Sequence, residues 1–97
     1  MDKEQLMRQL QPFLELSRQE GKLLEIVRLD DDLGLPGNGY IVHLLAPWSA
    51  DMTYGDTMDI VVDLLWRTTD VPLRMEIASL NVKPRRENFA ARFAGWV

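Results

Sequence analysis

Residues 58–67 read MDIVVDLLWR, and whether this segment is a strand or a helix decides the fold of the chain. Its charged side chains recur every fourth residue, as on a helix with one polar side: Asp59, Asp63 and Arg67. Its apolar side chains also alternate, as in a half-buried strand: Ile60, Val62, Leu64 and Trp66. The periodicity of this segment by itself leaves both structures open.

The neighbouring sequence favours the strand. Residues 60–62 are β-branched, and such side chains prefer extended backbone. A second alternating segment, residues 73–82, follows after the short polar link 68–72. Two alternating segments joined by five residues are typical of a hairpin, so we predict a strand at 58–67 that pairs with 73–82. The alternative is a helix with Asp56 as its N-cap.

Residues 3–19 have helical spacing, with apolar side chains recurring at steps of three and four. Asp2 can cap the start of this helix, and Gly21 can end it. Pro12 removes one backbone hydrogen bond and crowds the carbonyl of Arg8. We therefore predict that the helix either kinks at Pro12 or breaks there into two shorter pieces.

Two further segments are predicted strands. Residues 22–29 alternate, with Leu24 and Ile26 on one face and Leu29 on the other. Residues 40–46 are apolar on both faces, which is typical of a central strand, and Pro47 ends them. In this second strand His43 shares its face with Ile41 and Leu45, which predicts a mostly buried histidine with its hydrogen bonds satisfied.

The segment between these strands, residues 30–39, begins with three acids and contains three glycines. Its acids do not follow the spacing of a calcium-binding EF-hand loop, and its glycines lack the Lys-Ser/Thr of a phosphate-binding loop. Gly37 and Gly39 suit backbone positions with positive φ, and Pro36 suits the corner before them. We interpret the segment as a turn and assign no metal site to Asp30, Asp31 or Asp32.

These segments predict one α+β domain over residues 1–97. An N-terminal helix packs on a mainly antiparallel sheet of about four strands, and a short helix follows within the C-terminal residues 85–97. One helix rarely covers a four-stranded sheet, so we expect an exposed apolar face that serves as an interaction surface.

Composition narrows the class of function. The chain has 97 residues, a net charge of -4 and no cysteine, which excludes disulfides and thiolate metal sites. No segment reads as a signal peptide or membrane span, so we predict a soluble, cytoplasmic protein without membrane contacts. The acidic composition argues against nucleic acid, although residues 83–97 carry four basic side chains and one acidic side chain.

No catalytic motif is evident, and we predict a protein without cofactor or metal. His43 is the only histidine, and the serines lack the context of a nucleophile. Asp59 and Asp63 share a face in either structure but have no apolar pocket to separate their pKa values, so we interpret them as a solvated face.

We therefore expect a small, non-catalytic module that binds a protein partner and forms a homodimer. The expected partner-binding residues are aromatic side chains in the loop 47–57 and near the C-terminus: Trp48, Tyr54, Phe89, Phe93 and Trp96. The alternative is a small-ligand or enzyme module with a pocket between helix and sheet, lined by His43 with Tyr54 or an aspartate nearby.

Overall fold

The computed structural model describes residues 1–35 and 37–85 and contains an N-terminal helix pair, a three-stranded sheet and a helical crossover. The helices α1 (Lys3–Gln9) and α2 (Gln11–Gln19) are separated at Leu10, and Pro12 lies in the first turn of α2. There its missing N–H costs nothing, because the first turn has no intrahelical acceptor. The predicted interruption near Pro12 is thus confirmed as a break into two helices.

The predicted cap of the first helix is also confirmed. The Asp2 carboxylate accepts a hydrogen bond of 2.7 Å from the Gln5 backbone N–H, and the Gln5 side chain accepts from the Asp2 N–H at 3.1 Å. This reciprocal box satisfies two donors that the helix leaves free. One side of the pair is fully buried, at Leu6, Leu10, Phe13 and Ser17.

The sheet has the order β1-β2-β3, with β2 (Tyr40–Leu45) in the centre. The strand β1 (Glu25–Asp31) pairs with β2 antiparallel, whereas β3 (Ile77–Lys83) pairs with β2 parallel. The prediction of about four mainly antiparallel strands is therefore wrong in number and in direction. The α+β class is confirmed.

A β-bulge in β1 changes which residues face the core. The register shifts between Ile26 and Arg28, so Leu29 pairs with Val42 and is buried, although strict alternation had placed it opposite Ile26. An extra residue in one strand reverses the alternation beyond it. The strand also continues to Asp31, and as a result Asp30 belongs to the sheet.

The turn between β1 and β2 follows the prediction. Residues 32–34 form a short 3₁₀ helix, η1 (Asp32–Gly34), and the Asp32 N–H donates to the Gly39 carbonyl at 3.0 Å. Gly37 and Gly39 have φ of +84° and +90°, the conformations for which the glycines were expected.

Residues 58–67 are helical, which corrects the predicted strand and hairpin. They belong to α3 (Tyr54–Thr68), and Thr53, not Asp56, is the N-cap: its hydroxyl accepts from the Asp56 N–H at 3.1 Å. The side chains that this helix buries have helical spacing: Thr57, Val61, Leu64 and Leu65. Burial of this side against the core outweighs the weak strand preference of residues 60–62, since tertiary packing commonly overrides propensity.

A parallel pair needs a long crossover, and α3 supplies it. The short helix α4 (Val71–Met75), capped by the Asp70 carboxylate on the Leu73 N–H at 3.0 Å, then leads into β3. The second alternating segment is thus part helix and part strand. The predicted C-terminal helix lies outside the described residues.

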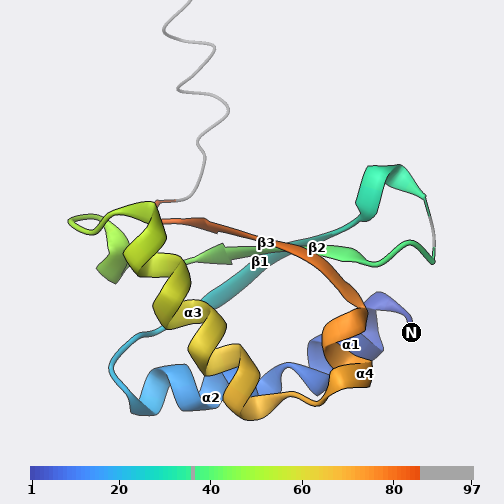
Figure 1. The fold of residues 1–97 in the computed structure, drawn as a ribbon, viewed down its shortest axis with the longest axis horizontal. Helices are drawn as coiled ribbons and strands as arrows, with labels where there is room; N and C mark the ends of the chain where they lie inside the picture. Colours follow the sequence, from blue (N-terminus) through green and yellow to red (C-terminus); the bar gives the residue numbers. More distant parts are fainter. Residues whose placement is uncertain (36, 86–97) are drawn as a thin grey trace, which may run out of the picture.

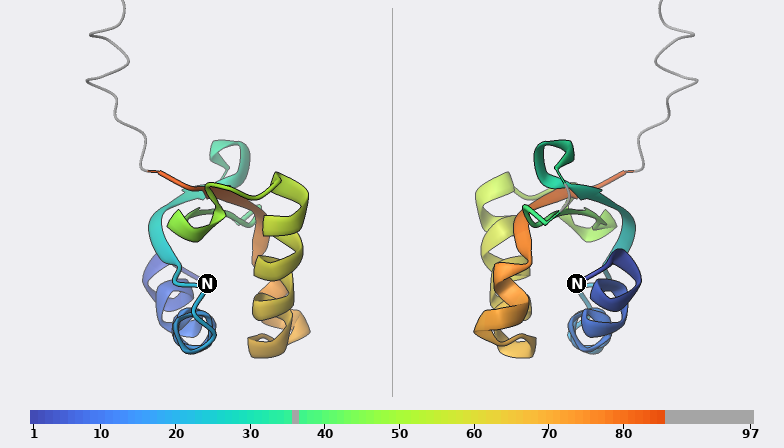
Figure 2. Two further views of the ribbon diagram at one scale, coloured as in Figure 1. Left: turned by 90° about the vertical axis from the view of Figure 1, so that its left-hand side faces the viewer. Right: turned by 90° about the vertical axis from the view of Figure 1, so that its right-hand side faces the viewer.

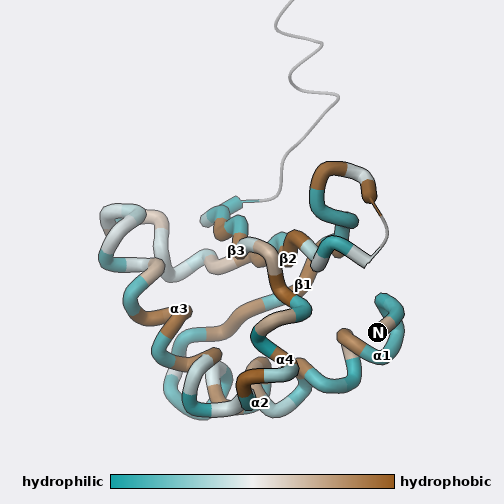
Figure 3. Tube along the Cα trace, turned by 45° about the vertical axis from the view of Figure 1, so that its right-hand side comes forward, coloured by the Kyte–Doolittle hydropathy of each residue, from teal (hydrophilic) through white to brown (hydrophobic). Residues whose placement is uncertain are grey.

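The four α-helices of residues 1–35 and 37–85 lie on one face of the sheet. Figure 1 shows the sheet along one side of the molecule and the helices along the other, and Figure 2 shows α1–α2 and α3–α4 as two walls below it. The core between them includes Phe13, Val42, Leu44 and Val61. Figure 3 shows the apolar stretches recurring along the strands and along α3. In the described part of the chain, no α-helix lies on the opposite face of the sheet, and the short η1 turn projects on that side.

Candidate functional sites: the open sheet face and helix α3

The uncovered face of the sheet presents the side chains that alternate with the core residues. The pairs across the strands place His43 beside Arg28 on β1 and Asn81 on β3. As predicted, His43 shares this face with Ile41 and Leu45, whose neighbours on β3 are Ser79 and Lys83. The open face is therefore mixed, with apolar side chains among charged and polar ones.

Both ring nitrogens of His43 have a hydrogen-bond partner. Its Nε2 lies 2.8 Å from the Asp30 carboxylate, and its Nδ1 lies 3.0 Å from the Asn81 amide nitrogen. The Arg28 guanidinium reaches the same Asp30 oxygen at 2.8 Å. The histidine side chain is 15% exposed, so the expected mostly buried ring is found, with polar partners in place of aliphatic ones.

Asp30 is the partner of His43 that sequence reasoning did not assign. The sequence predicts a strand that ends at Leu29, which places Asp30 in the acidic turn that follows. The bulge and the extension of β1 bring it to the open face two residues from Arg28. The only signal in the sequence was the alternation of Arg28 and Asp30 after an apolar strand, which is weak without the register.

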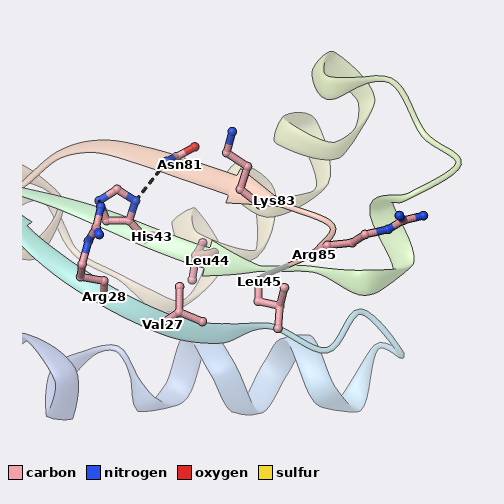
Figure 4. Close-up of a pocket in the computed structure, with 8 residues that line it drawn as sticks. All are labelled: Val27, Arg28, His43, Leu44, Leu45, Asn81, Lys83 and Arg85. Carbon is pink, nitrogen blue, oxygen red and sulfur yellow. Dashed lines mark hydrogen bonds between the residues drawn. The ribbon is translucent and has the colours of Figure 1, made fainter. Parts of the chain in front are cut away.

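A shallow hollow of about 280 Å³ lies beside His43 on this face. Its lining comes from all three strands and from the residues that follow β3: Val27, Arg28, His43, Leu44, Leu45, Asn81, Lys83 and Arg85. Figure 4 shows Arg28, His43 and Asn81 grouped together, with Lys83 farther along β3 and Arg85 on the segment that follows it. Three of the eight lining residues are cationic and none is acidic, in a chain whose net charge is -4.

None of these eight side chains carries a hydroxyl, a thiol or a carboxylate, and the polar atoms of the lining side chains are those of Arg28, His43, Asn81, Lys83 and Arg85. Within residues 1–35 and 37–85, no three metal-ligating side chains lie close enough to hold an ion. The pocket lies on the outer face of the sheet, whereas the sequence had suggested one between helix and sheet.

Trp48 lies in η2 (Pro47–Ser49) and is engaged within the molecule. Its indole N–H donates to the Leu23 carbonyl at 2.8 Å, the ring packs partly against the core, and the Lys22 ammonium lies 5.4 Å from the ring centroid. These contacts give Trp48 a local structural role, because they hold the η2 segment against the residues that precede β1.

Tyr54, by contrast, is 58% exposed at the first position of α3. It begins a line of apolar side chains spaced every fourth residue, which we call the α3 stripe: Tyr54, Met58, Val62 and Trp66. Trp66 is 62% exposed and Val62 is 37% exposed. The Arg74 guanidinium stacks on one face of the Trp66 ring at 3.8 Å from its centroid.

Aspartates border the α3 stripe. Asp59 and Asp63 project from the next row of the same helix, one position beyond Met58 and Val62. The Arg67 guanidinium forms an ion pair with Asp63 at 3.1 Å and a second one at 2.7 Å with Glu20, the C-cap residue of α2. Trp66 was not among the predicted binding residues, because the strand assignment had turned it toward the core.

The expected anchors Phe89, Phe93 and Trp96 lie outside the described residues. Comparison of the chain with protein-family models, with curated proteins and with solved structures gave no match. In the part of the chain that the structure describes, no helix has the length and apolar character needed to cross a membrane.

Proposed function

We propose that this protein is a small, non-catalytic interaction module whose binding surface is the α3 stripe. The observation that carries the proposal is the exposure of Trp66 and Tyr54 at the two ends of one helical row, with Val62 between them. Tryptophan and tyrosine are the residues that most often anchor protein interfaces. A row of this kind, bordered by acids, is a surface on which an amphipathic helix can lie.

The length and the charges of the α3 stripe indicate what kind of segment would bind to it. Trp66 lies twelve positions after Tyr54, which corresponds to about 18 Å of helix, or just over three turns. Asp59 and Asp63 along one border favour a partner segment with basic side chains beside its apolar row. The partner is therefore a short, basic, amphipathic segment.

The chain itself contains a sequence with this chemistry, which makes a second copy the partner that we propose. Its last residues carry aromatic side chains at steps of four and three, at Phe89, Phe93 and Trp96, together with Arg86 and Arg92. Binding of this segment of one copy to α3 of another, and the reverse, would form a closed homodimer. This interpretation unites the expected dimer with the expected aromatic residues.

Sedimentation velocity of the full chain tests the proposal. We expect association that weakens at least about tenfold in Trp66→Ser, because a tryptophan that anchors an interface is typically worth about 2 kcal/mol or more of binding. Met75→Ser is the matched control, since Met75 is 79% exposed but lies on α4, off the stripe. A parent chain that stays monomeric at all concentrations, or equal loss in both variants, would refute the proposal.

A further inference from the structure

The hollow on the open sheet face contains hydrogen-bond donors for which residues 1–35 and 37–85 supply no carboxylate partner. Among the described residues, no carboxylate forms an ion pair with Lys83 or Arg85. Arg28, at the opposite side of the hollow, is neutralised by Asp30 at 2.8 Å. Counting only ion pairs among the described residues, Arg28 is paired with a carboxylate, Lys83 and Arg85 are not, and none of the residues that line the hollow is acidic.

Asp30 and Asn81 contact the two ring nitrogens of His43, so the protonation state of the ring determines which Asn81 atom faces the hollow. In the neutral ring, one tautomer satisfies both contacts: Nε2–H donates to Asp30, and Nδ1 accepts from the Asn81 amide N–H. The Asn81 oxygen is then turned away from the ring, toward Lys83 (Figure 4). In this state an anion in the hollow would meet the Asn81 oxygen, which is an acceptor, among groups that otherwise donate hydrogen bonds.

A protonated His43 changes that arrangement. Both ring nitrogens then donate, so Nδ1–H needs the Asn81 oxygen, and the amide must turn over to supply it. The amide N–H₂ then faces the hollow as a donor, and the ring adds a positive charge. The charged groups around His43 are the Asp30 carboxylate, 2.8 Å from Nε2, the Arg28 guanidinium, 3.4 Å from the same nitrogen, and Lys83 on β3.

We propose that this hollow binds a small organic oxyanion and that binding is coupled to uptake of one proton by His43. Lys83 and Asn81 contact the oxyanion, with Arg85 at its outer side, while His43 is a positioning residue that acts through Asn81. Val27 and Leu45 form the apolar part of the lining, which suits a ligand with a short apolar body attached to its sulfate or phosphate group. This site is separate from the α3 stripe and does not depend on the function proposed for it.

Methyl sulfate and phenyl sulfate are suitable probes, because both carry one negative charge that does not change between pH 6 and 8. We expect each to cause saturable chemical-shift changes in the ¹H–¹⁵N NMR spectrum of the full chain at His43, Asn81 and Lys83. Phenyl sulfate should bind about fivefold more tightly, since its ring buries additional apolar area on Val27 and Leu45. Saturation elsewhere on the molecule, or none, would overturn the site.

Two variants separate direct contact from proton coupling. Lys83→Gln should weaken phenyl sulfate binding about fivefold at every pH, as expected for loss of one exposed charge pair. His43→Gln should leave binding nearly independent of pH, whereas the parent should bind several-fold more tightly at the low end of a pH series than at its high end, because binding is coupled to uptake of one proton by His43. Lys3→Gln on α1 is the charge-matched control and should bind like the parent.

The two parts of the proposal fail in distinguishable ways. If Lys83→Gln and Lys3→Gln bind phenyl sulfate equally, the hollow is not the anion site. If Lys83→Gln alone weakens binding but the parent shows no dependence on pH, the coupling through His43 is wrong. Dispersed NMR spectra of each variant establish that it is folded, so that loss of binding reports on the site.

Discussion

Gly39 shows at the scale of one residue how the turn after β1 is built. Its φ is +90°, and a Cβ placed there would lie 3.2 Å from the Ala78 Cβ of β3. Gly37 has a similar φ of +84° but has no atom within 4 Å of such a Cβ. Gly39 is thus needed both for its conformation and for its close approach to β3, whereas Gly37 is needed for its conformation alone.

This difference predicts unequal effects of the same substitution. Gly37→Ala should lower the free energy of unfolding by about 1 kcal/mol, the usual cost of a left-handed non-glycine residue. Gly39→Ala should cost about 2 kcal/mol or more, because strain and crowding add. Urea denaturation of both variants measures the difference, and equal losses would contradict the close packing of Gly39 on Ala78.

Tyr40 joins the N-terminus to the sheet, since its hydroxyl donates to the Met1 carbonyl at 2.6 Å. Desolvation of the phenol, and then the negative charges of Asp31, Asp2 and Glu76, raise the pKa of Tyr40 above its ordinary value of 10.0. The folded state therefore retains this proton more strongly than the unfolded chain does. The resulting stabilisation is fully present below pH 10 and is lost as the pH rises through the raised pKa.

A pH series tests this linkage. The free energy of unfolding of the parent should fall as the pH rises above about 10, the ordinary tyrosine value. Tyr40→Phe should reduce the slope of that fall, because phenylalanine cannot ionise. Denaturation curves recorded at several alkaline pH values give both slopes, and identical slopes would mean that Tyr40 does not contribute.

At the scale of elements, α3 is where reasoning from the sequence and the structure diverge. The predicted strand turned Val62 toward the core and Val61 away from it. The helix does the reverse: Val61 is 0% exposed and Val62 is 37% exposed. Periodicity could not separate the two structures, because the apolar residues of 58–67 fit both patterns. Packing against α2 and the sheet decides between them, and no local pattern contains that information.

Adjacent substitutions distinguish the two structures in solution. Val61→Asp should reduce the free energy of unfolding by about 3 kcal/mol or more, because it buries an unpaired charge. Val62→Asp should change it by no more than about 0.5 kcal/mol, as is usual for surface positions. Thermal or urea denaturation provides the comparison, and a greater loss in Val62→Asp would support the strand.

At the scale of the whole molecule, the α-helices of the described residues cover one face of the sheet, and the other face carries a mixture of apolar, polar and charged side chains. The sequence predicted the α+β class, the N-terminal helix, the turn glycines and the face that His43 occupies. It could not predict the parallel pairing of β3, which depends on α3 being a helix. Nor could it predict the contact of Asp30 with His43, because one bulged residue in β1 sets the register there.

The proposed homodimer has a direct test in a dilution series of the ¹⁵N-labelled full chain followed by NMR. If two copies associate through the α3 stripe, the backbone signals of Val62 and the indole signal of Trp66 should move with concentration. The signals of Ile41 and Leu45 on the open sheet face should stay in place. Concentration-dependent shifts confined to Ile41 and Leu45, or no shifts at any concentration, would contradict α3 as the binding surface.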